Sequence, residues 1–499
     1  MLPHILESTK LFYPELALSA AFCAVVLADL VFRGNRTLTS LVGMAGVLVA
    51  LYLVATQAPG EHSAFSDMLA VDGFSRFFKI VILASTFIVQ LFSVQSAELK
   101  SRSMGTGEYS ALLTALALGM SLMAGASNML MMYLALELTS LTSYLLAGYT
   151  REAEDSAEAA LKYVIYGAVA SGMMLYGISI VYGLTGALDF YSVNLALGAG
   201  DINLWTLVLA GVLIMVGFGY KISAVPFHFW TPDVYEGAPV TITALLSVAS
   251  KAAGFAMMIR FFRVTFADLV MGGQGMGGWA ILGGFQWTQL LAVMAVLSMT
   301  VGNLVALWQN NLKRLLAYSS IAHAGYMLLG VVALSPEGIS AVLIYFVVYL
   351  FMNLGAFYIV MLVADKTGSE DMTAYAGLGK KSPFIGVAMT VFLLSLTGLP
   401  PTAGFIGKLY IFSALIGAKM IGLVVIAALN SVLSLYYYVR VLKSMFFKDA
   451  EPGGAAFGIS AAEAALVLLL LIPTLLLGLY FGPLVEYAQA SVSMFGIPR

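Results

Sequence analysis

The chain has 499 residues, of which 61% are hydrophobic and only 10% are charged. A typical soluble domain is about 25% charged, so this composition and a mean hydropathy of +0.95 exclude a soluble globular or disordered chain. The net charge of -2 also excludes the basic stripe by which proteins bind nucleic acid. The chain is instead long enough for many spanning helices of about 20 apolar residues each.

Apolar segments separated by short polar breaks recur along the whole chain. They do not alternate between apolar and polar residues, as strands of a membrane β-barrel would. The sequence therefore predicts an all-α integral membrane protein with about fourteen transmembrane helices. The expected helices span 14–32, 38–56, 76–96, 108–126, 127–149, 159–183, 204–223, 240–262, 286–308, 314–334, 338–364, 383–418 (broken), 420–446 and 461–482.

Two of these helices carry interruptions, at 223–226 and 398–401, and both interruptions contain proline. Proline lacks the backbone N–H, and broken helices in transporters occur where the backbone lines a cavity. The two interruptions predict an internal repeat made of helices 4–8 and 9–13. Because five is an odd number, consecutive copies are expected to be inverted. An ordinary kink is the alternative interpretation of each proline.

The predicted organisation has four parts. These are three N-terminal transmembrane helices in 1–100, a first antiporter-like repeat in 101–265, a second in 280–447, and a C-terminal transmembrane helix in 455–499.

The lysines and arginines of the loops predict the orientation. Cytoplasmic loops of membrane proteins carry the excess of positive charge. With the N-terminus outside, 14 of these residues fall on the cytoplasmic side and 7 on the outer side, so both ends of the chain are expected on the periplasmic side. The 14 are Arg33, Arg36, Lys100, Arg102, Arg151, Lys162, Lys313, Arg314, Lys366, Lys380, Lys381, Arg440, Lys443 and Lys448. The 7 are Lys10, Arg76, Lys79, Arg260, Arg263, Lys419 and Arg499.

Four charged residues fall deep inside predicted helices: Glu137, Lys221, Lys251 and Lys408. On insertion scales a charge at a helix centre costs roughly 2.5–3.5 kcal/mol, and such residues normally face a protein interior or a wet cavity. We expect Glu137 to be a proton-carrying carboxylate or the partner of a lysine. The alternative is a structural ion pair between helices.

Polar side chains accompany Lys251 on its helix. Thr243, Ser247, Ser250, Lys251 and Gly254 share one face by their spacing of three and four residues. Such a stripe is expected to line a hydrated path. Helix packing through small residues is the alternative.

Two histidines are candidates for proton transfer. His323 shares a helix face with Ser319, Ser320 and Tyr326, which favours a proton relay over a histidine that is merely packed in the core. His228 is predicted at a membrane edge, where anchoring is favoured over a direct role with protons.

No motif in the sequence indicates a resident cofactor. Cys23 is the single cysteine, so no internal disulfide or multi-cysteine metal site is possible. No glycine-rich nucleotide motif follows a strand-like segment. Any redox chemistry is therefore expected in a partner.

Five stretches resemble the antiporter-like N subunits of proton-pumping NADH:quinone oxidoreductase, the respiratory complex I. They are Leu134–Leu138, Lys221–Pro239, Ser247–Phe255, Asn311–Tyr326 and Ser395–Lys408, and the resemblance extends over about 100–445. The chain lacks the long C-terminal lateral helix of the L type. Lys408 stands where the M type has glutamate. One departure is that 237–241 lacks an extra Thr-Pro found in relatives, which affects no charged position.

The resemblance implies a role for each candidate residue. Glu137 and Lys221 would form the pair of a first half-channel, and Lys251 would bridge to the centre. His323 would lie on the path of the second repeat, and Lys408 would be its terminal proton carrier.

The resemblance also implies a setting. The chain would translocate protons as a non-redox subunit of the membrane arm, with NADH, FMN, iron–sulfur clusters and quinone held by partner subunits. Its partners would include the M-type antiporter-like subunit and the small K-type subunit. The expected location is a bacterial plasma membrane, with a chloroplast-type relative as the alternative host. Two other functions stay open: a subunit of a sodium/proton antiporter, and a structural membrane subunit without its own proton path.

Overall fold

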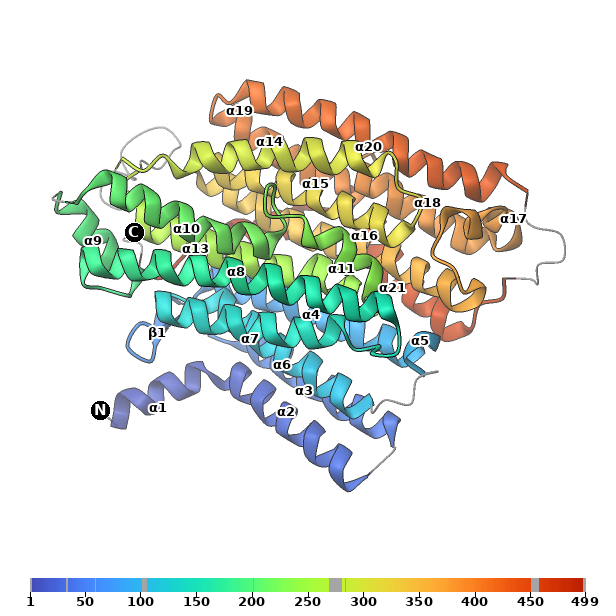
Figure 1. The fold of residues 1–499 in the computed structure, drawn as a ribbon, viewed down its shortest axis with the longest axis horizontal. Coiled ribbons are helices and arrows are strands. Elements are labelled where there is room, and N and C mark those ends of the chain that lie inside the picture. Colours follow the sequence, from blue (N-terminus) through green and yellow to red (C-terminus); the bar gives the residue numbers. More distant parts are fainter. Residues whose placement is uncertain are drawn as a thin grey trace.

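The computed structural model describes residues 2–32, 35–58, 60–100, 106–200, 202–268, 281–282, 284–449 and 457–496. The boundaries expected at 101, 280 and 455, and the loop charges Arg33, Arg102 and Arg499, lie outside these residues. Nearly all of the described chain is helical, as Figure 1 shows.

Thirteen helices in the described ranges are long and apolar enough to cross a membrane. The remaining predicted helix, 383–418, was expected to be broken and is a pair of shorter apolar helices, α18 (Pro383–Thr397) and α19 (Ala403–Gly417). The all-α membrane fold is therefore confirmed. The long helices are α2 (Tyr13–Val31), α3 (Arg36–Thr56), α4 (Gly73–Gln95), α6 (Thr106–Gly125), α7 (Met129–Ala147), α8 (Glu154–Thr185), α10 (Leu204–Ile222), the continuous helix from α12 (Val240–Leu245) through η1 (Leu246–Ser250) to α13 (Lys251–Phe266), α14 (Trp287–Ala306), α15 (Leu312–Val332), α16 (Pro336–Thr367), α20 (Ile421–Phe447) and α21 (Ala461–Leu479).

Short elements that the sequence analysis did not predict cover both ends of the bundle. One end carries α9 (Phe190–Gly198), both termini and a hairpin of β1 (His62–Ala64) and β2 (Leu69–Val71), in which His62 pairs with Val71 (Figure 1). The other end carries α5 (Ala97–Lys100), η3 (Met372–Tyr375) and α17 (Leu378–Lys381). We call them the α9 end and the α17 end. The remaining short helices are α1 (Leu2–Leu11), α11 (Trp230–Gly237) and α22 (Gly482–Ala490).

The helices of the two predicted repeats match one another in detail. The first set is α6, α7, α8, α10 and α12–α13, and the second is α14, α15, α16, α18–α19 and α20. The third helix of each set, α8 and α16, has 32 residues and ends at a left-handed glycine, Gly186 or Gly368. An isolated bridge follows each time, Asn128 with Asp189 and Asn311 with Asp371. The first bridge adjoins α9 and the second adjoins η3, so they lie at opposite ends of the bundle. This places the two sets in inverted orientations.

The interruptions also correspond. The helix α10 ends at Ser223 with φ 62°, and α18 ends at Gly398 with φ 89°. Each is followed by a cis X-Pro bond, before Pro226 and before Pro401. The internal symmetry that the prolines indicated is therefore present in the backbone.

Burial differs strongly between the helices. Every residue of α12, η1 and α13 is buried, and α15 and α16 are buried along most of their length. By contrast, most residues of α2, α20 and α21 are not buried. The interior therefore lies around α13, α15 and α16, and polar groups on these helices are enclosed by protein.

Candidate functional site: a line of buried basic side chains

Lys251 lies at the centre of the molecule. The π turn η1 ends at Ser250, and α13 begins at Lys251, whose exposed fraction is 1%. Its Nζ donates to the carbonyl of Ser320 at 2.8 Å and contacts the Ser320 Oγ at 2.9 Å. A π turn inserts one extra residue and rotates the following side chains, and such turns are frequent at functional sites. Here the turn immediately precedes the lysine that contacts α15.

The polar stripe on the Lys251 helix faces polar groups of the protein. Thr243 donates to the carbonyl of Tyr235 at 3.0 Å, and Asn353 donates to Ser247 at 2.7 Å. Gly254 serves close packing instead, because a Cβ there would lie 3.2 Å from the Lys221 Cγ. Packing therefore accounts for Gly254, and a hydrated path along the stripe stays a prediction.

Lys221 occupies the last turn of α10 and is buried. Its Nζ donates to the Ser140 Oγ of α7 over 3.4 Å, which is a long hydrogen bond. Gly254 is on the helix that carries Lys251, and the Lys221 side chain packs closely against it. The structure therefore places the first two lysines on packed neighbouring helices.

Glu137 lies three residues before Ser140 on α7, close enough to Lys221 for their charges to interact. Among the described residues no ion pair within 4.0 Å joins them, so the pair implied by the resemblance is a near approach without a salt bridge. Glu137 is half-buried, and its Oε1 is buried without a hydrogen-bond partner. It lies at the margin of the site, not inside it.

His323 on α15 is enclosed by hydroxyl groups. Its Nδ1 shares a hydrogen bond with the Tyr345 OH at 2.7 Å, and its Nε2 lies 3.5 Å from the Tyr438 OH. Tyr438 in turn shares a hydrogen bond with Ser319 at 2.5 Å. A hydroxyl both donates and accepts, so these partners accommodate either tautomer of the imidazole.

Lys408 spans the break between α18 and α19. Its Nζ donates to the carbonyl of Thr397, the last residue of α18, at 2.7 Å, and to the Ser431 Oγ at 2.8 Å. The ammonium lies 4.5 Å from the ring centre of Tyr326, and Ser431 donates to the Tyr326 OH at 3.4 Å. A Cβ at Gly398 would approach the Lys408 Cδ to 2.8 Å, so glycine is required at that turn.

The helix α15 connects these groups. Ser320 contacts Lys251, His323 contacts Tyr345 of α16, and Tyr326 contacts Lys408 of α19. Ser320, His323 and Tyr326 follow one another at intervals of three residues on α15. Each therefore lies about 4.5 Å farther along the helix axis than the one before it and faces a different neighbouring helix. The structure thus brings together Lys221, Lys251, His323 and Lys408 as a line of buried basic groups across the molecule.

His228 does not join this line. It lies in the turn between α10 and α11, is 6% exposed, and has a buried Nδ1 without a partner. A buried ring does not fit the anchoring at a membrane edge that the sequence favoured.

The sequence analysis missed further buried charges. Lys79 pairs with Glu15 at 2.6 Å, and Arg260 pairs with Asp72 at 2.6 Å, with all four side chains almost fully buried. The prediction counted Lys79 and Arg260 with the outer side because they lie within three residues of the expected helix ends at 76 and 262. In the structure α4 begins at Gly73 and α13 extends to Phe266, which places both residues six positions inside their helices. The helix ends are where hydropathy alone is least informative.

Ion pairs centred on α11, which is not one of the spanning helices, join the two repeats. Asp233 of α11 accepts from Lys162 of α8 at 2.5 Å and from Arg314 of α15 at 2.8 Å. Burial acts to raise the pKa of Asp233, but these hydrogen bonds outweigh it and hold the pKa below its usual value. This cluster ties the start of α15, in the second repeat, to the broken helix of the first.

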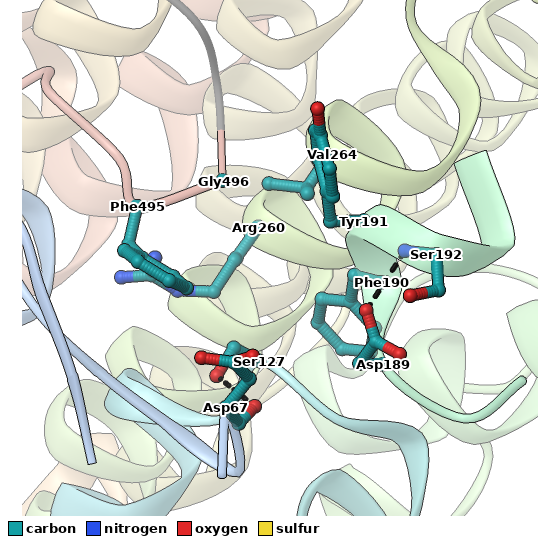
Figure 2. A pocket seen from close by; sticks show the side chains of 10 residues that line it. All are labelled: Asp67, Ser127, Asp189, Phe190, Tyr191, Ser192, Arg260, Val264, Phe495 and Gly496. Carbon is teal, nitrogen blue, oxygen red and sulfur yellow. Dashed lines mark hydrogen bonds between the residues drawn. The ribbon is translucent and has the colours of Figure 1, made fainter. Parts of the chain in front are cut away.

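The hollows at the bundle ends are separate from the lysine line. A cavity of about 220 Å³ at the α9 end is lined by Asp67, Asp189, Arg260 and aromatic side chains, among others (Figure 2). A wider hollow of about 660 Å³ at the α17 end is lined by acidic residues and Lys313. No group of three or more histidine, cysteine or acidic residues among those described could hold a metal ion.

Comparison with known proteins gives a consistent result. Residues 126–434 match the family model described as NADH:quinone oxidoreductase/Mrp antiporter, TM. The chain is 49% identical over 494 residues to NADH-quinone oxidoreductase subunit N 2 of Chloroherpeton thalassium, covering 97% of this chain and 94% of that one. It is similar to a chain of respiratory complex I from Thermus thermophilus with bound aureothin, at 33% identity and a TM-score of 0.74, covering 93% and 98%. It also shares its fold with a chain of the Mrp complex from Dietzia sp. DQ12-45-1b, at 20% identity and a TM-score of 0.80, covering 98% and 97%.

Proposed function

Because this chain belongs to the NADH:quinone oxidoreductase/Mrp antiporter membrane family, we propose that it is an N-type subunit of an NADH:quinone oxidoreductase that translocates protons. The observation that carries the proposal is the line of Lys221, Lys251, His323 and Lys408 through the protein interior. Buried charge inside a membrane protein is expensive and marks ion pathways by default. A purely structural subunit has no reason to hold three lysines whose ammonium groups bond almost only to neutral partners.

The arrangement suggests how protons move. Each lysine holds a proton as an ammonium group and passes it on through adjacent hydroxyls and water. Ser320 contacts Lys251, and Ser431 contacts Lys408, so each lysine has a hydroxyl that can both accept and donate. A charge on one lysine disfavours a charge on the next. A proton arriving at one site therefore promotes release at its neighbour.

Glu137 adjusts the first lysine. Its carboxylate attracts the Lys221 ammonium, and a movement of α7 that changes this distance loads or unloads the proton. Protons then pass through Lys251 and His323, and Lys408 exchanges with the opposite side. NADH, FMN, iron–sulfur clusters and quinone belong to partner subunits in this proposal, and so does the redox energy that drives the movement.

The proposal includes a setting in a bacterial plasma membrane, among an M-type and a K-type neighbour. The α17 end, with most of the loop lysines and arginines, faces the cytoplasm, and the α9 end with both termini faces the periplasm. A sodium/proton antiporter is not favoured, because the Mrp likeness supports the fold alone, whereas Lys408 and the stretch after Pro226 resemble the N type.

The test uses the assembled complex in membranes. Lys251→Ala and Lys408→Ala should each lower NADH-driven proton pumping by about tenfold or more, because each removes a proton-carrying group. Lys443→Ala is the matched control, since Lys443 is an exposed lysine on α20. Assembly is checked by the amount of complex and by its flavin content. Normal pumping in both buried-lysine variants would overturn the proposal in favour of a structural subunit.

A further inference from the structure

The helix α4 belongs to the N-terminal helices outside both repeats, yet it packs along the whole interrupted helix α12–η1–α13. Bonds join α4 to this helix near both ends, one on each side of the π turn. The proton path proposed above makes no use of α4. Its contacts therefore need their own explanation.

The first attachment is a buried carboxylate that joins three segments. Asp72 caps α4 by accepting from the Ser75 amide at 2.8 Å. The same carboxylate accepts from both terminal nitrogens of Arg260 on α13, at 2.6 and 2.9 Å. It also accepts from the Phe495 amide at 2.9 Å, so the C-terminal segment is fixed to the same point. Both charged side chains are fully buried.

A bidentate pair of this kind fixes orientation as well as distance, because the planar guanidinium matches the carboxylate only in one plane. The pKa of Asp72 shows the strength of the contact. Burial acts to raise it, and the charge and hydrogen bonds of Arg260 nevertheless hold it below its usual value. The end of α13 is therefore held firmly against the start of α4.

The second attachment is at the opposite end of the interrupted helix. Tyr109 of α6 shares a hydrogen bond with Thr241 of α12 at 2.7 Å and another with Ser93 of α4 at 2.9 Å. Tyr109 and Thr241 are both buried. One phenol thus ties the first turn of α12 to the last turns of α4.

We propose that α4 is a splint for the interrupted helix, and that Asp72 and Tyr109 are positioning residues that hold Lys251 at Ser320. The π turn has a weaker hydrogen-bond pattern than a regular helix, and it lies between the two attachments. Without them, fewer contacts oppose a rotation of α12 relative to α13 about the turn, and such a rotation lengthens the 2.8 Å contact of the Lys251 ammonium. The inference rests on the proposed function, in which Lys251 carries protons.

Thr241 offers the sharpest test, because one substitution removes its hydroxyl with little change of shape and another keeps the hydroxyl. Thr241→Val keeps the shape and removes the bond to Tyr109, whereas Thr241→Ser keeps the hydroxyl. In assembled complex, Thr241→Val and Tyr109→Phe should lower the pumping rate by about two- to fivefold, and Thr241→Ser should leave it unchanged. The KM for NADH should not change in any of these variants. Equal rates for Val and Ser at position 241 would overturn the inference.

A double-mutant cycle separates positioning from general loosening of the fold. If Tyr109 acts through the Lys251 contact, Tyr109→Phe should have a smaller effect in a Ser320→Ala background, which has already lost the hydroxyl part of that contact and keeps the carbonyl. Independent, multiplying losses would overturn the inference.

Glu15→Gln is the matched control, because it breaks another buried pair of α4 on the side of α2, and it should leave the pumping rate at the wild-type level. A loss in this control equal to that of Tyr109→Phe would also count against the splint.

Asp72→Asn tests the other attachment and should lower pumping at least as much as Tyr109→Phe. Where this variant fails to assemble, the Thr241 pair decides. Lys251→Ala in the same series keeps the two proposals distinguishable. If Lys251→Ala pumps normally, the proposed function fails. If it is inactive while Thr241→Val, Tyr109→Phe and Asp72→Asn pump normally, only the splint fails.

Discussion

The two halves of the molecule share a backbone pattern but treat their lysines differently. Lys221 of the first half lies near a carboxylate and has one long hydrogen bond of 3.4 Å. Lys408 of the second half has two short hydrogen bonds, to neutral oxygens, and an aromatic ring beneath its ammonium. Each half thus has a buried lysine beside its break, before the break in the first half and after it in the second, and the surroundings of the two lysines differ. The loosely held lysine suits adjustment by a neighbouring acid, and the tightly held one suits a fixed end of the path.

The largest effect that tests this contrast concerns Glu137. Glu137→Gln should lower the pumping rate by about fivefold, because the Lys221 ammonium loses its nearby negative charge. If the carboxylate acts only through Lys221, Glu137→Gln should add nothing to Lys221→Gln. The rate of NADH-driven pumping per flavin is measured in assembled complex for the wild type, the two single variants and the double variant, which together form a double-mutant cycle. An additive loss would show that the acid works on another group, and the contrast between the halves would no longer hold.

A smaller effect is expected from Ser431 and Ser140, which contact Lys408 and Lys221. Ser431→Ala removes a 2.8 Å bond to Lys408 and should slow pumping about threefold. Ser140→Ala removes only the 3.4 Å contact to Lys221 and should change the rate by less than about 1.5-fold. Stopped-flow measurement of proton release in proteoliposomes compares the two directly. The contrast is wrong if Ser140→Ala proves the more damaging substitution.

The smallest effect concerns the ion pairs that join the halves. Asp233 has a pKa below its usual value because Lys162 and Arg314 outweigh its burial. Its contribution to stability is therefore complete above the usual pKa of about 3.9 and is lost as the pH falls through the lowered value in the folded protein. Since the group is partly exposed, we expect about 1 kcal/mol or less at neutral pH.

Thermal unfolding of the purified complex measures the contribution of Asp233 to stability. The melting temperature of Asp233→Asn should be slightly below that of the wild type at pH 7, and the difference should shrink below about pH 4. A difference that grows as the pH falls has the wrong sign for a carboxylate stabilised in its charged form.

Much of the membrane topology could be predicted from the sequence, because apolar runs of spanning length are read directly from hydropathy. The predicted segments 204–223 and 420–446 coincide with α10 and α20 to within one residue. Short elements such as α9 and the hairpin could not be predicted in this way, because they are much shorter than a spanning segment. They owe their structure to contacts at the bundle end, as in the bridge between Asn128 and Asp189.

The candidate site was predictable in part. Lys221, Lys251 and Lys408 stood out because charge is rare in this chain, and the structure places them in one line with His323. Their partners Tyr345, Tyr438 and Ser431 lie on other helices, so no spacing within one segment indicates them. Arg260 was missed for a different reason, because an arginine near a predicted helix end has the same appearance in a sequence as one in a loop.

The complete burial of Val240–Phe266 has a consequence for biogenesis. This segment carries Lys251, Arg260 and Arg263, and each such charge near a helix centre opposes entry into lipid by roughly 2.5–3.5 kcal/mol on insertion scales. Its apolar residues drive it into the bilayer while its charges hold it back. The carboxylate that neutralises Arg260 precedes α4, which leaves the ribosome well before this segment. The early helices are therefore in a position to receive the charged segment as it is synthesised, so that its arginine need not face lipid alone.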